Sequence, residues 1–370
     1  MRILAPHTDS FGGYGGIAAA NRHFLRAACT TEAVDEVVGI PRLMPEIPTE
    51  TLPEALTLRT NGLGGKWPYL RALLRELAVD RNFDLVWCGH IHLVPLALLA
   101  GRLTGSPVVL HVHGIDAWTP TEKPLVNRLV PRVDAFISVS ETTKRRLVEW
   151  SGLDDDQGYV VPNTIDFDGL SPGPKPSSLF DRYDLHDNHV LMTMGRLVGP
   201  ERKKGFDRVL EVLPDVAAER PDVAYMIVGK GPDRDRLERK AARLNVRERV
   251  VFAGYVPDHE KADHFRVADQ FVMPSEGEGF GLVLLEALAC GTPVVASRRD
   301  GGREAVADGE FGTLVDPRSN SDIKEAILGD AARPDPEVVQ QRFGPEAYRS
   351  RVARTIIDLR KHDGHVKTAG

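Results

Sequence analysis

Residues 270–296 read QFVMPSEGEGFGLVLLEALACGTPVVA, and the class of fold can be inferred from this stretch. The run Gln270–Met273 predicts a strand, because β-branched and aromatic residues favour extended backbone. A glycine-rich loop follows, the apolar segment LVLLEALA predicts a helix, and Pro293–Ala296 predicts a second strand. A strand, a helix and a strand in this order are typical of a βαβ unit, so the stretch indicates an α/β fold with a parallel sheet.

The same alternation extends over both halves of the chain. In the first half we predict strands at Met1–Pro6, Asp35–Ile40, Leu85–Cys88, Val108–Val112, Ala135–Ser140 and Tyr159–Val161. In the second half we predict further strands at Val190–Met194, Ala224–Val228, Val250–Ala253 and Thr313–Val315. Amphipathic spacing predicts helices at Ile17–Cys29, Pro68–Val79, Leu93–Leu103, Glu141–Trp150 and Glu346–Lys361.

A segment rich in Pro and Gly separates the two halves. It contains Gly169, Pro172, Gly173, Pro174 and Pro176, which is typical of a linker between domains. We therefore predict an N-terminal domain at 1–168, a linker at 169–188, a C-terminal domain at 189–345, and a final helix and tail at 346–370. Because ligands of open parallel sheets bind beyond the carboxyl ends of the strands, we expect functional residues in the loops that follow strands.

Composition excludes several classes of protein. The chain has 370 residues with 47 Lys+Arg against 53 Asp+Glu, a formal charge of −6 that argues against nucleic acid as the main partner. The apolar run Leu93–Ala100 is far shorter than the roughly 20 residues of a membrane-spanning helix. Three distant cysteines, Cys29, Cys88 and Cys290, form neither a disulfide framework nor a zinc pattern. We expect a cytoplasmic protein.

Three loops after predicted strands carry candidate binding residues. The first, Gly12–Gly16, opens a helix and suits either a bound phosphate or a tight turn. The second contains Arg196, Lys203 and Lys204, which suit either a diphosphate or a solvated surface turn. Neither loop matches a dinucleotide fingerprint or a P-loop.

The third loop surrounds a glutamate with glycines. Glu278 precedes the predicted helix, and the amides at its start, from Gly279 to Leu282, are available to an anion. Glu286 lies eight residues beyond Glu278, inside the apolar helix, where a carboxylate needs a polar partner. A structural hydrogen bond explains Glu286 as well as a ligand does.

These motifs resemble the retaining glycosyltransferases of the GT-B fold that form glycosyltransferase family 4. The resemblance covers nearly the whole chain, and the segment from Glu278 to Glu286 is its most specific part. Its other landmarks are Gly15-Gly16, Val112-His113-Gly114, Ser138-Val139-Ser140, the segment 161–166, Gly195-Arg196-Leu197, Lys204-Gly205 and Gly301-Gly302-Arg303-Glu304.

The resemblance implies a role for each matching residue. His113 would lie beside the donor sugar, Glu278 would contact that sugar, and Glu286 would bind the ribose hydroxyls. The implied catalytic residues are His113, Glu278, Arg196 and Lys204, of which the two basic ones would neutralise the diphosphate. The implied donor-binding residues are Gly15, Gly16, Arg196, Lys204, Gly254, Tyr255, Val256, Glu278, Gly279, Phe280, Gly281 and Glu286.

The resemblance also implies the activity. Two Rossmann-like, doubly wound domains would face a central cleft, and the C-terminal helix would cross back to the first domain. The protein would move a hexose from a UDP- or GDP-linked sugar to an acceptor hydroxyl, with retention of configuration and without a metal or other cofactor. The acceptor stays open between a sugar, a glycolipid and a small metabolite. The alternatives are another GT-B enzyme, such as a nucleotide-sugar epimerase or hydrolase, and a nucleotide-sugar-binding pseudoenzyme.

The sequence leaves the role of two segments open. The loop from Arg196 to Gly205 is longer than in the family, so Lys203 and Lys204 compete for the diphosphate, and we favour Lys204. The second feature is a basic and aromatic segment that suits either peripheral contact with anionic lipid at the inner membrane face or a half-buried amphipathic helix, which we favour. Its residues are Lys66, Trp67, Tyr69, Arg71 and Arg75.

Overall fold

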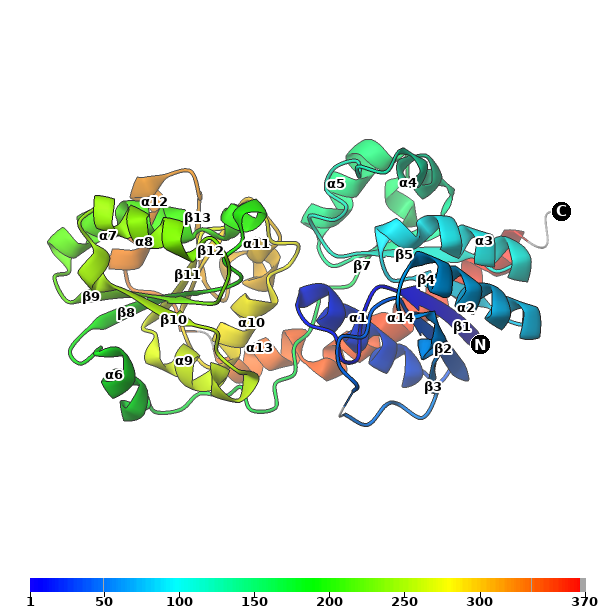
Figure 1. Cartoon of the computed structure of the whole chain (residues 1–370), viewed down its shortest axis with the longest axis horizontal. Helices are drawn as coiled ribbons and strands as arrows, with labels where there is room; N and C mark the ends of the chain where they lie inside the picture. Colours follow the sequence, from blue (N-terminus) through cyan, green and yellow to red (C-terminus); the bar gives the residue numbers. More distant parts are fainter. Residues whose placement is uncertain (49, 334, 367–370) are drawn as a thin grey trace. The chain divides into compact units, whose positions relative to one another are not determined.

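The computed structural model describes residues 1–48, 50–333 and 335–366, and it divides into two compact units. The first unit comprises Met1–Thr164 together with Pro345–Gly370, and the second comprises Ile165–Gly344. Each unit is a parallel sheet with helices on both faces, as the ribbon in Figure 1 shows. The predicted α/β fold with two doubly wound domains is therefore confirmed.

The sheet of the first unit has the strand order β3-β2-β1-β4-β5-β6-β7. All neighbouring strands pair in parallel. The strand order reverses direction between β1 and β4, which is where an open sheet of this kind places its ligand. The strands are β1 (Arg2–His7), β2 (Glu36–Pro41), β3 (Leu56–Leu58), β4 (Leu85–Cys88), β5 (Val108–Val112), β6 (Ala135–Ser138) and β7 (Gly158–Val160).

Helices cover this sheet from two sides. On one face, α1 (Gly16–Cys29) and α14 (Pro345–Val366) pack on the strands, with Phe24 stacked on Trp87 at 4.4 Å between ring centroids. The helices on the other face are α2 (Lys66–Val79), α3 (Val94–Thr104), α4 (Pro124–Leu129) and α5 (Glu141–Ser151). The final helix therefore belongs to the first unit although the second unit precedes it in sequence.

The sheet of the second unit has the order β10-β9-β8-β11-β12-β13. Its strands are β8 (His189–Met194), β9 (Val223–Val228), β10 (Val250–Gly254), β11 (Gln270–Met273), β12 (Val294–Ser297) and β13 (Thr313–Val315). Its helices are α6 (Ser177–Tyr183), α7 (Phe206–Glu219), α8 (Arg234–Arg243), α9 (Lys261–Val267), α10 (Leu282–Ala289), α11 (Gly302–Ala305), α12 (Asn320–Leu328) and α13 (Pro336–Phe343).

Strand β3, helix α4 and helix α6 are among the elements that the sequence does not predict. Strand β3 and helix α4 are too short for their periodicity to stand out. Helix α6 lies within the predicted linker, and it packs on α9, where Tyr183 Oη bonds His264 Nε2 at 3.0 Å. The Pro- and Gly-rich composition indicates a break in the chain but gives no sign of this seven-residue helix.

Two backbone crossings fix the loops at the carboxyl edge of the second sheet. Gly229 follows β9 with φ +138°, and a Cβ there would overlap the carbonyl oxygen of Gly195 in the loop after β8. A Cβ on Gly231 would likewise overlap the carbonyl oxygen of Leu197. Only glycine permits both this backbone conformation and this close approach, so the two loops hold a fixed spacing.

Replacement of Gly229 by alanine should strongly destabilise the second unit. We expect Gly229→Ala to lower the free energy of unfolding by about 3 kcal/mol or more, because it combines backbone strain with a steric overlap. The control is Gly169→Ala, where φ is +82° but no atom lies within 4 Å of the new Cβ. That control should lose only about 1 kcal/mol from the left-handed backbone. Urea unfolding followed by circular dichroism measures both free energies of unfolding. Equal losses in the two variants would show that the close approach of Gly229 to Gly195 adds no cost of its own.

Candidate functional site

The carboxyl edge of the second sheet carries the predicted residues of that unit. Arg196 follows β8 and is exposed, Gly254 ends β10, Glu278 follows β11, and Gly301 follows β12. All these strands are parallel, so their loops meet at one edge of the sheet. The residues that the sequence scatters over more than 100 positions therefore share one surface.

At this edge a lysine and a glutamate form an ion pair. Lys204 Nζ lies 2.6 Å from Glu278 Oε1, and the Glu278 side chain is only 10% exposed. Gly205, with φ +90°, lets the Lys204 loop pass so close to Pro274 that a Cβ would clash with it. The structure therefore brings Lys204 to Glu278, whereas Lys203 is exposed and contributes its carbonyl oxygen to the amide of Glu276.

The carboxylate of Asp300 holds the Glu278 loop, and no sequence pattern predicts this role. Asp300 is fully buried, and its Oδ2 accepts hydrogen bonds from Ser275 Oγ at 2.7 Å and from the amide of Glu278 at 2.9 Å. Its Oδ1 accepts from the amide of Gly302 at 3.0 Å. The available signal was its place between a strand end and two glycines, but a single Asp there resembles any turn residue.

Burial changes the acidity of Asp300. Desolvation, with the nearby negative charge of Glu278 added, raises the pKa of Asp300 to about 7, although its three hydrogen bonds favour the charged form. A proton thus stays on this buried group over a pH range in which an exposed aspartate is ionised. The carboxyl group ties the loop after β11 to the loop after β12.

Glu286 on α10 has a polar partner, as expected for a carboxylate in an apolar helix. Its Oε1 lies 3.6 Å from Lys261 Nζ on α9, and Lys261 also bonds Asp258 at 2.8 Å. Burial raises the pKa of Glu286, and the charge of Lys261 partly offsets that rise. For Lys261, burial acts to lower the pKa, but the two carboxylates outweigh it and the pKa is raised. The pair therefore favours the charged form of Lys261, whereas the pKa of Glu286 stays above its ordinary value despite the lysine.

An exposed aromatic ring lies beside the strand end of β10. Tyr255 is 61% exposed, and Lys230 Nζ lies 4.6 Å from the centre of its ring. The amide of Gly229 donates to the carbonyl of Gly254 at 2.7 Å, which ties this loop to the loop after β9. The neighbouring Val256 is buried. Tyr255 thus offers a flat face on which a ring system can stack.

The glycine-rich segment before α10 contributes backbone rather than side chains. Gly281 has φ +95° and caps the helix, while Phe280 is buried with its ring 5.8 Å from that of Phe343. Any ligand contact of Phe280 therefore uses its amide. Gly279 precedes it, and a Cβ on Gly301 would overlap the Gly279 carbonyl, which keeps the segment pressed against the loop after β12.

In the first unit, the predicted residues also lie at the carboxyl edge of the sheet. Gly15 and Gly16 are exposed at the start of α1, and Gly15 has φ +87°. His113 follows β5, and its Nε2 lies 3.1 Å from the carbonyl oxygen of Gly89, which follows β4. Burial raises the pKa of Asp9, in the loop after β1, and the nearby His113 opposes this rise. No sequence pattern indicates Asp9, since an isolated Asp in a glycine-rich loop is an ordinary turn residue.

Removal of the buried acid should change how stability depends on pH. The folded pKa of Asp300 lies above its ordinary value of 3.8, so the folded state binds the extra proton. Its contribution to stability is complete below about pH 4 and is lost as the pH rises toward 7. We expect wild-type stability to fall between pH 4.5 and 6.5 more steeply than that of Asp300→Asn, by up to about 1.4 kcal/mol per pH unit.

Urea unfolding at several pH values measures this difference. Ser275→Ala is the control, because it removes one hydrogen bond and leaves the titrating group in place. Parallel pH profiles for wild type and Asp300→Asn would contradict the assignment.

Two family models together match most of the chain. Residues 15–168 match the model described as Glycosyltransferase Family 4, and residues 180–329 match the model described as Glycosyl transferases group 1. The two matches fall on the first and second unit respectively.

Similar proteins of known name support the same grouping. A GDP-mannose-dependent alpha-(1-6)-phosphatidylinositol monomannoside mannosyltransferase of Mycolicibacterium smegmatis is 34% identical over 274 residues, which is 70% of each chain. A phosphatidyl-myo-inositol mannosyltransferase of Mycobacterium leprae is 31% identical over 366 residues, covering 94% of this chain and 92% of the relative.

Solved structures share the fold at lower identity. The crystal structure of Anabaena Alr3699/HepE in complex with UDP and glucose is 21% identical with a TM-score of 0.75, covering 97% of this chain and all of that one. A sucrose-phosphate synthase from Thermosynechococcus elongatus has a TM-score of 0.67 at 19% identity, covering 100% of this chain and 98% of that one. With the family models and the relatives above 30% identity, these findings show that the chain belongs to glycosyltransferase family 4 and has the GT-B fold.

Proposed function

We propose that this protein transfers mannose from GDP-mannose to a hydroxyl of a phosphatidylinositol-type glycolipid. The ion pair between Lys204 and Glu278 carries the proposal, because it puts a cation and a carboxylate at one ligand-binding edge. The donor and the acceptor come from the names of the two mycobacterial relatives, which are a GDP-mannose-dependent enzyme and a phosphatidylinositol mannosyltransferase.

The chemistry of the reaction suits these side chains. When the bond between the anomeric carbon and the phosphate oxygen breaks, negative charge builds on the diphosphate and positive charge on the sugar. Lys204 and Arg196 are the groups proposed to stabilise the diphosphate, and Glu278 the group that accepts hydrogen bonds from the sugar hydroxyls. Before the donor binds, the pairing with Glu278 keeps the ammonium of Lys204 at the site.

Further binding contacts follow the same logic. Glu286 accepts hydrogen bonds from the ribose hydroxyls, with Lys261 Nζ 3.6 Å from its Oε1. The ring of Tyr255 stacks beside the base, and Gly254 and Val256 line that region. For Gly15, Gly16 and His113 in the first unit, we propose the contacts with phosphate and sugar that the family resemblance implies.

We propose that transfer retains the anomeric configuration. The acceptor hydroxyl attacks on the face from which the diphosphate departs, and a diphosphate oxygen takes its proton. We also propose that the reaction needs no metal ion, since two basic side chains supply positive charge where the leaving group forms.

The direct test supplies GDP-mannose and phosphatidylinositol in detergent micelles to the whole protein. We expect a mannosylated lipid with an α linkage, assigned by NMR, and an unchanged rate in excess EDTA. Free mannose as the sole product would indicate a hydrolase, and an altered nucleotide sugar would indicate an epimerase. Binding of the nucleotide without formation of any product would indicate a pseudoenzyme. Loss of the rate in EDTA would contradict metal independence alone.

The adjacent lysines offer a matched pair of variants. We expect GDP at 100 times its dissociation constant to stabilise the wild type by about 2.7 kcal/mol in thermal unfolding. Lys204→Met should lose most of this shift, and its kcat/KM should fall by about 10² or more, because a cation at the leaving group is gone. Lys203→Met should keep both, since Lys203 is exposed and contacts the loop through its backbone. If Lys203→Met loses more of the GDP stabilisation and of kcat/KM than Lys204→Met, then Lys203 is the residue that contacts the diphosphate. If UDP stabilises the protein and GDP does not, the donor carries UDP.

A further inference from the structure

Buried polar atoms without a hydrogen-bond partner gather around His113 in the first unit. They are Nδ1 of His113, Oδ2 of Asp116 and both ring nitrogens of His111, none of which bonds any residue that the structure describes. The rings of His111 and His113 have their centroids 4.6 Å apart. A buried polar atom costs free energy unless a ligand or an opposite charge compensates it, so these atoms need an explanation.

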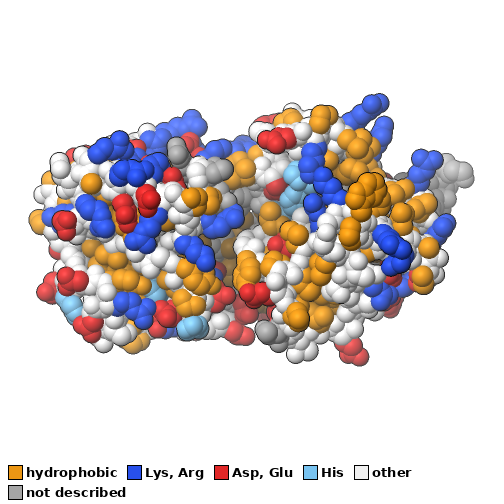
Figure 2. All heavy atoms as spheres, in the orientation of Figure 1, with side chains coloured by type: hydrophobic (Ala, Val, Ile, Leu, Met, Phe, Trp, Pro, Cys, Tyr) orange, Lys and Arg blue, Asp and Glu red, His pale blue; other side chains and the backbone are white. Residues whose placement is uncertain are grey.

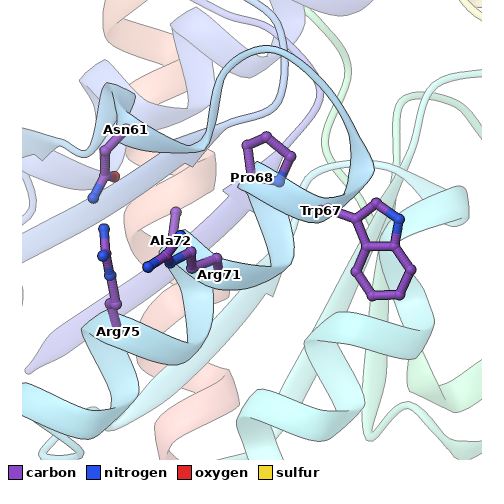
Figure 3. Close-up of a pocket in the computed structure, with 6 residues that line it drawn as sticks. All are labelled: Asn61, Trp67, Pro68, Arg71, Ala72 and Arg75. Atoms are coloured by element: carbon purple, nitrogen blue, oxygen red, sulfur yellow. The ribbon is translucent and has the colours of Figure 1, made fainter.

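The polar groups beside helix α2 are different, because they are exposed. This helix is half-buried as expected: the hydroxyl of buried Tyr69 donates to the carbonyl of Ile40 at 3.0 Å, whereas Trp67 is 80% exposed. Its outer side borders a hollow of about 330 Å³, and Figure 3 shows Asn61 and Arg75 there, extending toward each other. Water reaches these side chains, so the hollow requires no partner. Among residues 1–48, 50–333 and 335–366, no helix has the length and apolar character to cross a membrane.

A single turn after β5 holds Asp116 against the backbone of His113. Asp116 Oδ1 accepts a hydrogen bond from the amide of His113 at 3.3 Å, and the amide of Ala117 donates to the carbonyl of Gly114 at 2.9 Å. His113 Nε2 lies 3.1 Å from the carbonyl oxygen of Gly89, which can only accept, so Nε2 carries a hydrogen. Nδ1 is therefore the ring nitrogen that is left for a ligand.

Helix α5 fixes this turn from the other side. Trp150 Nε1 donates to the carbonyl of Ala117 at 2.9 Å, and Nε1 of the buried Trp118 donates to Thr143 Oγ1 at 3.0 Å. The guanidinium carbon of Arg146 lies 3.8 Å from the centre of the Trp118 ring. Because two tryptophans hold the turn, Asp116 and His113 keep a fixed relative position.

The groups around His113 act on its charge in opposite directions. Figure 2 shows histidine side chains at the surface of the first unit next to Lys and Arg side chains. Burial lowers the pKa of His90 to about 3, burial lowers the pKa of His111 as well, and the charge of His113 adds to both effects. These histidines thus disfavour a proton on His113. Burial raises the pKa of both Asp9 and Asp116, and the charge of His113 opposes each rise, so the two carboxylates favour that proton.

We propose that Asp116 is a positioning residue that acts through His113. Its carboxylate holds the amide of His113 and attracts the protonated imidazole, whose Nδ1–H then donates to a hydroxyl of the sugar. Since carboxylate and imidazolium have opposite charges, the pair adds no net charge beside a sugar on which positive charge develops. The inference rests on the proposed function, in which His113 contacts the sugar.

The first experiment measures kcat and KM for GDP-mannose with phosphatidylinositol in micelles. Asp116→Asn keeps a side-chain oxygen for the amide of His113 and removes the charge. We expect its kcat to fall about tenfold, because a charge-assisted hydrogen bond becomes a neutral one, while KM changes by less than about twofold. His113→Gln should lose at least as much, and adding Asp116→Asn to it should cost nothing further. Melting temperatures check that the variants fold.

An aspartate at the other end of β5 provides the matched control. Asp134 Oδ2 accepts a hydrogen bond from the amide of Val108 at 2.7 Å, so Asp134→Asn makes the same chemical change far along the strand from His113. We expect this control to keep the wild-type kcat and KM. An unchanged kcat in Asp116→Asn, an equal loss in Asp134→Asn, or a full additional loss in the double variant would each overturn the proposal.

A second measurement separates this proposal from the proposed function. Ring ¹⁵N NMR signals of His113, assigned by their absence in His113→Gln, report its protonation without any substrate. At about pH 6.5, the ordinary midpoint of histidine, Asp116→Asn should move these signals toward the neutral form and Asp134→Asn should not. Unmoved signals would overturn the role of Asp116 even if mannose is transferred. Moved signals without any transfer would support the pairing and show that the donor or acceptor is wrong.

Discussion

A buried carboxylate, Asp300, is the interaction on which the rest of the donor-side structure depends. Its two oxygens receive hydrogen bonds from Ser275, from the amide of Glu278 and from the amide of Gly302, which joins the loops after two neighbouring strands. The position of Glu278, and with it the ion pair to Lys204, follows from these bonds. A charged or protonated group in such a place is costly to bury, so its hydrogen bonds must be satisfied within the loops.

Glycine supplies the second constraint on the same loops. The crossings at Gly229 and Gly231, and the packing of Gly205 on Pro274, bring backbones closer than any side chain allows. These contacts hold the site by geometry, whereas Asp300 holds it by hydrogen bonding. Together they hold a cation and a carboxylate on a rigid edge, which is the preorganisation that a reaction with a charged leaving group requires.

Side chains at the polar site and on the outer face of α2 differ in how they are buried. At the site, carboxylates are buried and need partners, as Glu286 finds in Lys261. On the outer face of α2, apolar and basic side chains are exposed together and lack a partner of complementary charge on their own helices apart from Glu76, which Arg59 binds. The carboxylates of the site find their partners within the chain, whereas the apolar and basic side chains on the outer face of α2 are exposed to solvent.

The α/β class, most strands to within a residue or two, and the family follow from the sequence alone, because βαβ periodicity and the segment from Glu278 to Glu286 are local patterns. The preference for Lys204 over Lys203 at the diphosphate stays a prediction; the structure shows that Lys204 pairs with Glu278. Three features depend on distant contacts and are visible only in the folded chain: Asp300 as the residue that joins two loops, Lys261 as the partner of Glu286, and helix α6 within the predicted linker. Periodicity reports which face of an element is buried, whereas hydrogen-bond partners and the burial of a single carboxylate depend on residues tens of positions away.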